Sequence, residues 1–320
     1  MIPSSSLVLL LLLLLPAAGG EVPFIAQKPN SCGPAALAMV ANYYGNPVTQ
    51  DEIAAAITTA RGTVTAELAA HAGKLGFWVR AYRGSLADLR QKTAAGVPLI
   101  VLGKFGGNDH YFVVLRLDDW RKTVTVHSDT RANLEMSQEA FGRYWGRANE
   151  WMLVVCPPDR VTWKLTAEEH NDLGVFLEKA GQLAQAAGHY LRATELAPAK
   201  SYYHLNLGNA LLKQKLYAEA AAAYGKAVQT APDNADALNN LANAYLELGA
   251  NLDEAERLCR RAIELRPAHR AYYLDTLGAV LLKQGKTSEA MAAFAQALAA
   301  ATDRQESLRD AIRQRLKALQ

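Results

Sequence analysis

The stretch "VPFIAQKPNSCGPAALAMVANYYG", residues 22–45, sets a lone cysteine before a Gly-Pro pair and a run of Ala, Leu, Met and Val. We predict a helix from Gly33 to Tyr44. Cys32 then lies one residue before the helix, where free N–H groups and the helix dipole favour a thiolate and lower the cysteine pKa. Pro34 suits the first helical turn, because its missing N–H costs nothing there. The pattern therefore favours a reactive thiol over a buried one.

The amino-terminal residues "MIPSSSLVLLLLLLLPAAGG" predict a signal peptide over residues 1–20. The apolar run from Leu7 to Leu15 is short for a membrane span, which needs about 20 apolar residues, but it fits the core of a secretory leader. We therefore expect export, to the periplasm or the outside of a bacterial cell, with no stable membrane span after leader removal. A net charge of +3 without a dense Lys/Arg block argues against nucleic acid as a partner.

The remaining chain divides into two parts with different sequence patterns. Residues 21–158 combine helical patterns with five strand-like stretches, "FWVRAY", "PLIVLGK", "HYFVVLRL", "KTVTVHS" and "EWMLVV". Helices followed by mostly antiparallel strands predict an α+β domain. Residues 159–165 are expected to be a linker, residues 166–302 about four helical repeats, and residues 303–320 a charged capping helix.

The second part repeats itself with a period of 34 residues. Five pairs recur at this spacing: Gly174 and Gly208, Ala186 and Ala220, Tyr190 and Tyr224, Ala193 and Ala227, and Pro198 and Pro232. This pattern resembles the tetratricopeptide repeat, which forms an all-α solenoid that usually binds a peptide or a protein. We expect the small residues to let paired helices approach closely, and Tyr190 to fill the space toward the next repeat.

A nucleophilic thiol needs a base, and the strand patterns point to His110. The stretches "HYFVVLRL" and "KTVTVHSDT" predict a β-hairpin with its turn centred on residues 119–120. Residues equidistant from the turn lie opposite each other, so His110 should face Asp129, whose carboxylate would fix the imidazole tautomer. His127 is expected on the same face and is the fallback base.

Gln27 lies five residues before Cys32, where its amide could donate to an oxyanion together with the Cys32 backbone N–H. Cys156 and Cys259 are expected to be buried packing residues. The sequence has no C-x-x-C pair, and we expect neither a metal nor a cofactor.

The block Gln…Cys-Gly-Pro-Ala…Tyr-Tyr-Gly, with "HYFVVL" and "SDT", resembles the papain-like double-glycine peptidases of bacteriocin-processing transporters. The resemblance covers residues 22–155 and implies a papain-like fold. It also implies Cys32 as nucleophile, His110 as general base, Asp129 as the residue orienting it, and Gln27 in the oxyanion hole. The chain departs from the family pattern at Ser31, where Asp is frequent, and at Thr130, where Pro is frequent.

These observations predict an exported thiol hydrolase, a cysteine peptidase whose repeats recruit a protein substrate or partner. Two alternatives stay open. One is a catalytically silent, peptidase-like adaptor whose repeats carry the function. The other is acyl transfer on the same residues, with an amine replacing water.

Overall fold

The computed structural model describes residues 20–59 and 62–319, and the chain separates after Trp163 into two compact units. The predicted signal peptide, apart from residue 20, lies outside the described residues. In the part of the chain that the structure describes, no helix has the length and apolar character needed to cross a bilayer.

The first unit is an α+β domain, as predicted. Its helices are α1 (Cys32–Tyr43), α2 (Gln50–Ile57), α3 (Thr65–Lys74), α4 (Leu86–Ala94) and α5 (Gln138–Gly146), followed by the short 3-10 turn η1 (Pro158–Arg160). Its strands are β1 (Thr58–Thr59), β2 (Gly62–Thr63), β3 (Trp78–Arg83), β4 (Leu99–Phe105), β5 (Asn108–Asp118), β6 (Thr123–Ser128), β7 (Arg131–Ser137) and β8 (Trp151–Cys156).

The five predicted strands are present, while α4, α5 and β7 were not predicted. Both helices begin with a serine whose side chain accepts a backbone N–H, Ser85 from Asp88 and Ser137 from Ala140. A serine three residues before an acidic residue or ahead of a helical stretch is a readable start signal, so these helices could have been found. Strand β7 is an edge strand with mostly exposed side chains, but Ala132, Leu134 and Met136 stand at every second position, so its alternation was a readable strand signal.

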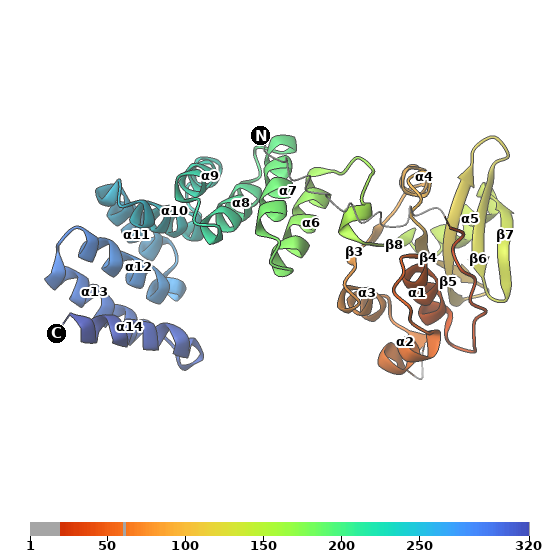
Figure 1. Ribbon diagram of the computed structural model, residues 1–320, viewed down its shortest axis with the longest axis horizontal. Helices are drawn as coiled ribbons and strands as arrows, with labels where there is room; N and C mark the ends of the chain where they lie inside the picture. Colours follow the sequence, from red (N-terminus) through yellow and green to blue (C-terminus); the bar gives the residue numbers. More distant parts are fainter. Residues whose placement is uncertain (1–19, 60–61, 320) are drawn as a thin grey trace, which may run out of the picture. The chain divides into compact units, whose positions relative to one another are not determined.

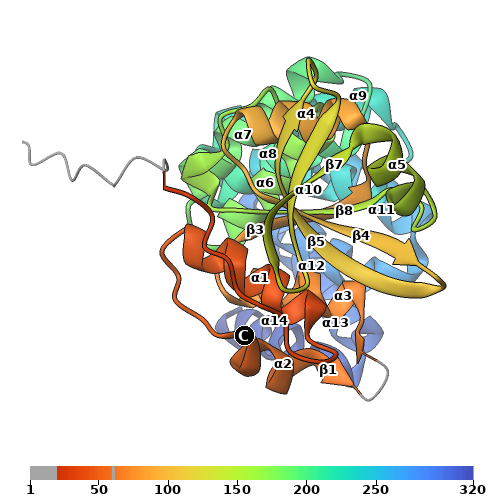
Figure 2. The same cartoon turned by 90° about the vertical axis from the view of Figure 1, so that its right-hand side faces the viewer.

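The main sheet has six strands in the order β3-β8-β4-β5-β6-β7, and every neighbouring pair is antiparallel. Helix α1 is almost entirely apolar and packs against β5, with α2 and α3 beside it (Figure 1). Its buried side chains form one core with inward residues of the sheet such as Ile100, Tyr111 and Val113. The β4–β5 hairpin reaches out from the sheet (Figure 2).

A β-bulge in the β5–β6 ladder changes which side chains share a face. Val113 pairs with His127 and Val114 with Val126, but Arg116 pairs with Thr125, so Leu115 has no ladder partner. One extra residue on one strand reverses the inward and outward alternation beyond it. His127 therefore shares its face with Val113 and not with His110.

The second unit is a run of helices: α6 (Ala167–Lys179), α7 (Leu183–Leu196), α8 (Ser201–Lys213), α9 (Tyr217–Thr230), α10 (Ala235–Leu248), α11 (Leu252–Leu265), η2 (Pro267–His269), α12 (Arg270–Lys283), α13 (Thr287–Ala300), η3 (Asp303–Gln305) and α14 (Glu306–Ala318). Helices α6 to α13 form four helical pairs, and α14 packs on α13. The predicted all-α repeat unit and its carboxy-terminal helix are thus present.

In three of the four pairs an aromatic ring lies against a glycine, while the pair of α10 and α11 has Ala242 and Cys259 at the corresponding positions. A Cβ on Gly208 would come within 2.4 Å of the Tyr224 ring, and one on Gly174 within 2.7 Å of the Tyr190 ring. The Tyr190 hydroxyl also donates to Glu178, 2.7 Å away in the partner helix. The expectation that Tyr190 points toward the next repeat needs correction, because this ring packs on its own repeat's glycine.

Candidate active site

Helix α1 begins at Cys32 itself, one residue earlier than predicted. Ser31 precedes it without capping the helix through its side chain, and the thiol of Cys32 is partly exposed. Gly33 is needed for close packing, since a Cβ there would lie 3.1 Å from Thr63 and 3.3 Å from the Tyr111 ring. The amino terminus of α1 is therefore seated against β2 and β5.

His110 lies near the start of β5, opposite Gly103 of β4. A Cβ on Gly103 would contact the side chains of Phe112 and Tyr144. Tyr144 belongs to α5, so His110 and Gly103 face the side of the sheet that α5 covers. The imidazole packs edge-on against Phe112 at a ring distance of 4.9 Å, and its side chain is 15% exposed. Burial lowers the pKa of His110, and the charge of Asp129 opposes that shift.

The predicted approach of His110 to Asp129 is present, with 3.8 Å between Nε2 and the nearer carboxylate oxygen. The reason differs from the one predicted. Asp129 directly follows the last residue of β6 and has a positive φ of 51°. The chain therefore makes a left-handed turn at Asp129, and this turn brings the carboxylate close to His110 without any strand pairing between the two residues. The hydroxyl of Ser128 lies closer, 3.0 Å from the same nitrogen. Ser128 was not predicted as a site residue, since a serine before an aspartate carries no signal without the turn.

Gln27 joins this group through its backbone, whose N–H donates to the carbonyl of Asp129 at 3.0 Å. Its side-chain Nε2 is buried and has no hydrogen-bond partner among the described residues. Buried hydrogen-bond donors almost always have a partner, so an unpaired buried amide N–H is unusual and is free to donate to an acceptor that binds here. An oxyanion at this place would supply one.

The thiol is not joined to the imidazole. No hydrogen bond connects Cys32 and His110 within residues 20–59 and 62–319. The Cys32 side chain packs against the hydrophobic core that contains α1. The pKa of Tyr111 is raised mainly by burial and additionally by the charge of Cys32. Tyr111 is the neighbour of His110 but points to the opposite face. The structure thus brings together Gln27, His110 and Asp129, while in the described residues no hydrogen bond joins the Cys32 sulfur to this group.

The profile described as the Peptidase C39 family matches residues 21–158, the whole α+β unit up to its last strand and first following turn. This part of the chain belongs to the Peptidase C39 family. Tetratricopeptide-repeat profiles match residues 171–235 and 233–303 of the helical unit. The protein therefore joins a C39 domain to tetratricopeptide repeats.

Two archaeal proteins resemble the C39 domain. An uncharacterized protein of Methanothermobacter thermautotrophicus is 32% identical over 126 residues, which is 39% of this chain and 83% of that protein. One of Methanothermobacter marburgensis is 32% identical over 114 residues, covering 35% and 75%. Among solved structures, MamA from Desulfovibrio magneticus RS-1 is 23% identical with a TM-score of 0.39, over 42% of this chain and 75% of that one.

His127 is not available as a base in the C39 domain. It is 2% exposed, its Nε2 lies 3.0 Å from the carbonyl of Val22, and its Nδ1 accepts the backbone N–H of Asn133. The ring of Phe24 packs edge-on against it. The prediction that His127 shares a face with His110 is wrong, because the bulge at Leu115 reverses the alternation. His127 anchors the amino-terminal segment instead.

The other two cysteines are buried, as expected. Burial raises the pKa of the Cys156 thiol to about 12 and that of the Cys259 thiol to about 12. Both are therefore protonated at neutral pH. In the described part of the chain, no three His, Cys, Asp or Glu side chains gather closely enough to hold a metal ion.

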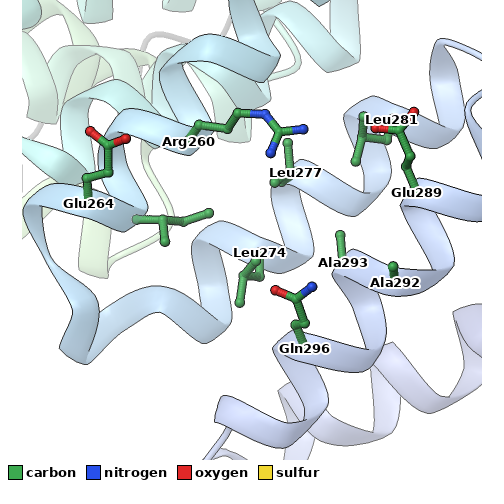
Figure 3. A pocket seen from close by; sticks show the side chains of 10 residues that line it. Arg260, Glu264, Leu274, Leu277, Leu281, Glu289, Ala292, Ala293 and Gln296 are labelled. Carbon is green, nitrogen blue, oxygen red and sulfur yellow. The ribbon is translucent and has the colours of Figure 1, made fainter.

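A pocket of about 520 Å³ opens beside His110 in the C39 domain. Its apolar walls are Phe105, Phe112, Leu134, Met136 and Tyr144, and its polar lining includes Asp109, Arg131, Ser128 and Asp129. A second hollow, of about 430 Å³, lies in the repeats between α11 and α13 (Figure 3). Leu274 and Leu277 of α12 form part of its lining, together with charged Arg260 and Glu289.

Proposed function

We propose that the C39 domain is a cysteine peptidase in which Cys32 is the nucleophile and His110 the general acid and base. The observation that carries this proposal is the unpartnered, buried amide of Gln27, held by its backbone beside Asp129 and five residues before the thiol. An amide donor with nothing to bind suits an oxyanion that exists only during reaction. Cys32 is also the one partly exposed thiol among the three cysteines.

In the proposed reaction the Cys32 thiolate attacks a peptide carbonyl carbon and forms a tetrahedral oxyanion. The Gln27 amide and the Cys32 backbone N–H donate to that oxygen. The protonated imidazole of His110 gives its proton to the departing amine, which leaves a thioester on Cys32. The neutral imidazole then takes a proton from water, whose oxygen attacks the thioester and releases the acid and the thiolate.

This chemistry requires the imidazole to reach the sulfur. The β5–β6 ladder ends at Val113, so in the described structure β6 does not pair with the edge of β5 beside His110. Nε2 of His110 faces Ser128, which leaves Nδ1 without a hydrogen bond in the described residues and available to the thiol. Hydrogen bonds between catalytic groups are often long until substrate binds, which is consistent with the separation seen here.

We further propose that the protein is exported, supported by the apolar leader sequence, and that the repeats bring a protein substrate or partner to the peptidase. The hollow between α11 and α13 is a candidate surface for such a partner, because apolar residues lie within a charged surround.

A second candidate function is a silent adaptor. One observation favours it: no hydrogen bond joins Cys32 to His110 in the described residues. In that case the protein would act only by binding a partner through its repeats, and the Cys32 thiol would not be activated as a nucleophile.

The deciding experiment is alkylation by iodoacetamide of the wild type, Cys32→Ala and His110→Ala at neutral pH. A peptidase site predicts one fast-reacting thiol, lost in Cys32→Ala and slowed in His110→Ala. Cys156 and Cys259 serve as internal controls, since both are buried and protonated. If Cys32 reacts no faster than free cysteine and His110→Ala has no effect, the adaptor is the better account.

A further inference from the structure

The group nearest to the outer nitrogen of His110 is not the expected carboxylate. Ser128, the last residue of β6, is 5% exposed, and its Oγ lies 3.0 Å from Nε2. The Asp129 carboxylate is 3.8 Å from that nitrogen, and its side chain is 60% exposed. A buried hydroxyl at hydrogen-bonding distance holds a ring more firmly than a solvated carboxylate beyond it.

A hydroxyl can either donate or accept, so the neighbouring charge decides the direction of this hydrogen bond. The carboxylate of Asp129 faces the same nitrogen and favours a proton there. Nε2–H then donates to the Ser128 oxygen. Nδ1 is left without a proton, and no described residue forms a hydrogen bond with it.

We propose that Ser128 is a positioning residue that holds His110 in its Nε2–H tautomer, with the bare Nδ1 available to take a proton from the Cys32 thiol. This inference rests on the proposed peptidase function. Ser128 does not touch the sulfur or the substrate, and it acts through the histidine alone.

Ser128 as a nucleophile in its own right fits the geometry poorly. A serine nucleophile needs its base to contact the carboxylate through the other ring nitrogen. Here the hydroxyl and the carboxylate both face Nε2, so the nitrogen beside Ser128 already carries a proton and cannot accept one from the hydroxyl.

The first test reads the tautomer directly and does not need activity. Long-range proton–nitrogen NMR spectra of the full-length protein should show the Nε2–H form of His110 in the wild type, with the signal assigned by its loss in His110→Gln. In Ser128→Ala the Nδ1–H form should appear beside it. Ser128→Thr keeps a hydroxyl and should restore the wild-type spectrum. An unchanged tautomer in Ser128→Ala would overturn the proposal.

The second test measures alkylation of Cys32 against pH in the same variants. Loss of one neutral hydrogen bond should slow alkylation at neutral pH about fivefold in Ser128→Ala, with recovery in Ser128→Thr. The unfolding midpoint of each variant reports whether it folds. If Ser128→Ala does not fold, Ser128→Val replaces it, because valine matches threonine in shape and lacks the hydroxyl. A tautomer change without any effect of His110→Ala on alkylation would retain the Ser128 contact and reject the peptidase.

Discussion

At the scale of single residues, Gln27 combines a structural cost with a chemical use. Its Nε2 is buried without a partner in the described structure, and an unsatisfied buried donor costs about 1–3 kcal/mol of folding free energy. Replacing Gln27 with Met removes that donor and keeps the side-chain length. We expect the free energy of unfolding to stay equal or rise in Gln27→Met, which urea denaturation would measure.

The same Gln27→Met variant should separate two reactions of the thiol. Acylation by p-nitrophenyl acetate passes through an oxyanion, and loss of a donor to it should slow this reaction about 100-fold. Alkylation by iodoacetamide forms no oxyanion and should keep its wild-type rate, which makes it the matched control. Equal slowing of both reactions would mean that Gln27 places the thiol and does not bind an oxyanion.

The residues of this site could be read from the sequence to different extents. Cys32 could be singled out as a candidate because its position before Gly-Pro and an apolar helix is a local pattern. Asp129 was placed correctly beside His110, although the contact depends on a left-handed turn. Ser128 was missed, because its contact exists only once that turn has formed. Local patterns identify groups, while their hydrogen bonds depend on the backbone path around them.

At the scale of elements, the helical pairs should be sensitive to any side chain at the glycine that meets the aromatic ring. A Cβ at Gly208 would be 2.4 Å from the Tyr224 ring, which is 0% exposed and cannot move without displacing its neighbours. We expect Gly208→Ala to lower the free energy of unfolding of the repeat unit by about 1–3 kcal/mol through overpacking.

Gly225 in α9 provides the matched control for Gly208→Ala. A Cβ there meets no atom within 4 Å, so Gly225→Ala should raise stability by about 0.5–1 kcal/mol through helix propensity alone. Circular dichroism at increasing urea concentration would compare the two variants. Equal effects at the two positions would refute the packing role assigned to the glycine.

The contrast with the sheet explains why repeats were easier to predict than the hairpin. The Gly–Tyr contacts of the first two repeats lie 34 residues apart, so the repeat is visible as a sequence period. The bulge at Leu115 has no such signature, because Val113, Val114 and Leu115 are equally acceptable in a regular strand. That single irregular residue moved His127 to the other face.

A pair of histidines makes the first repeat sensitive to acid. Nδ1 of His170 in α6 lies 3.0 Å from Nδ1 of His189 in α7. Burial lowers the pKa of both histidines. For His170 the charge of Arg192 lowers the pKa further, while the charges of Glu169 and Glu195 oppose this shift. Below about pH 6.5 the unfolded chain therefore binds more protons than the folded one, so stability falls as pH falls.

We expect the unfolding midpoint of the repeat unit to drop between pH 7 and pH 5, and His189→Gln to make that drop smaller. Thermal unfolding followed by circular dichroism at several pH values would measure it. A slope unchanged in His189→Gln would assign the acid sensitivity to other groups.

At the scale of the whole molecule, Trp163 decides where the first unit ends. It lies within the predicted linker, yet it is 7% exposed and stacks on Trp78 at a ring distance of 6.1 Å. The ammonium group of the buried Lys92 lies 5.7 Å from the Trp163 ring centre. These contacts belong to the C39 domain, so the helical repeats begin only after this residue.

Because each unit has its own buried core, a change at Trp163 should affect the two units unequally. Trp163→Ala removes a buried indole and should lower the free energy of unfolding of the C39 domain by about 3–5 kcal/mol. The repeat unit has its separate core and should keep its transition. Urea unfolding of the full chain, followed by tryptophan fluorescence for the first unit and helical circular dichroism for the second, would resolve both.

Trp120 is the matched control, since it is 88% exposed and its replacement by Ala should move neither transition. Separate transitions in the wild type, with only the first displaced in Trp163→Ala, would show that the C39 domain folds without support from the repeats. Joint displacement of both transitions would instead mean that the two units unfold as one cooperative body.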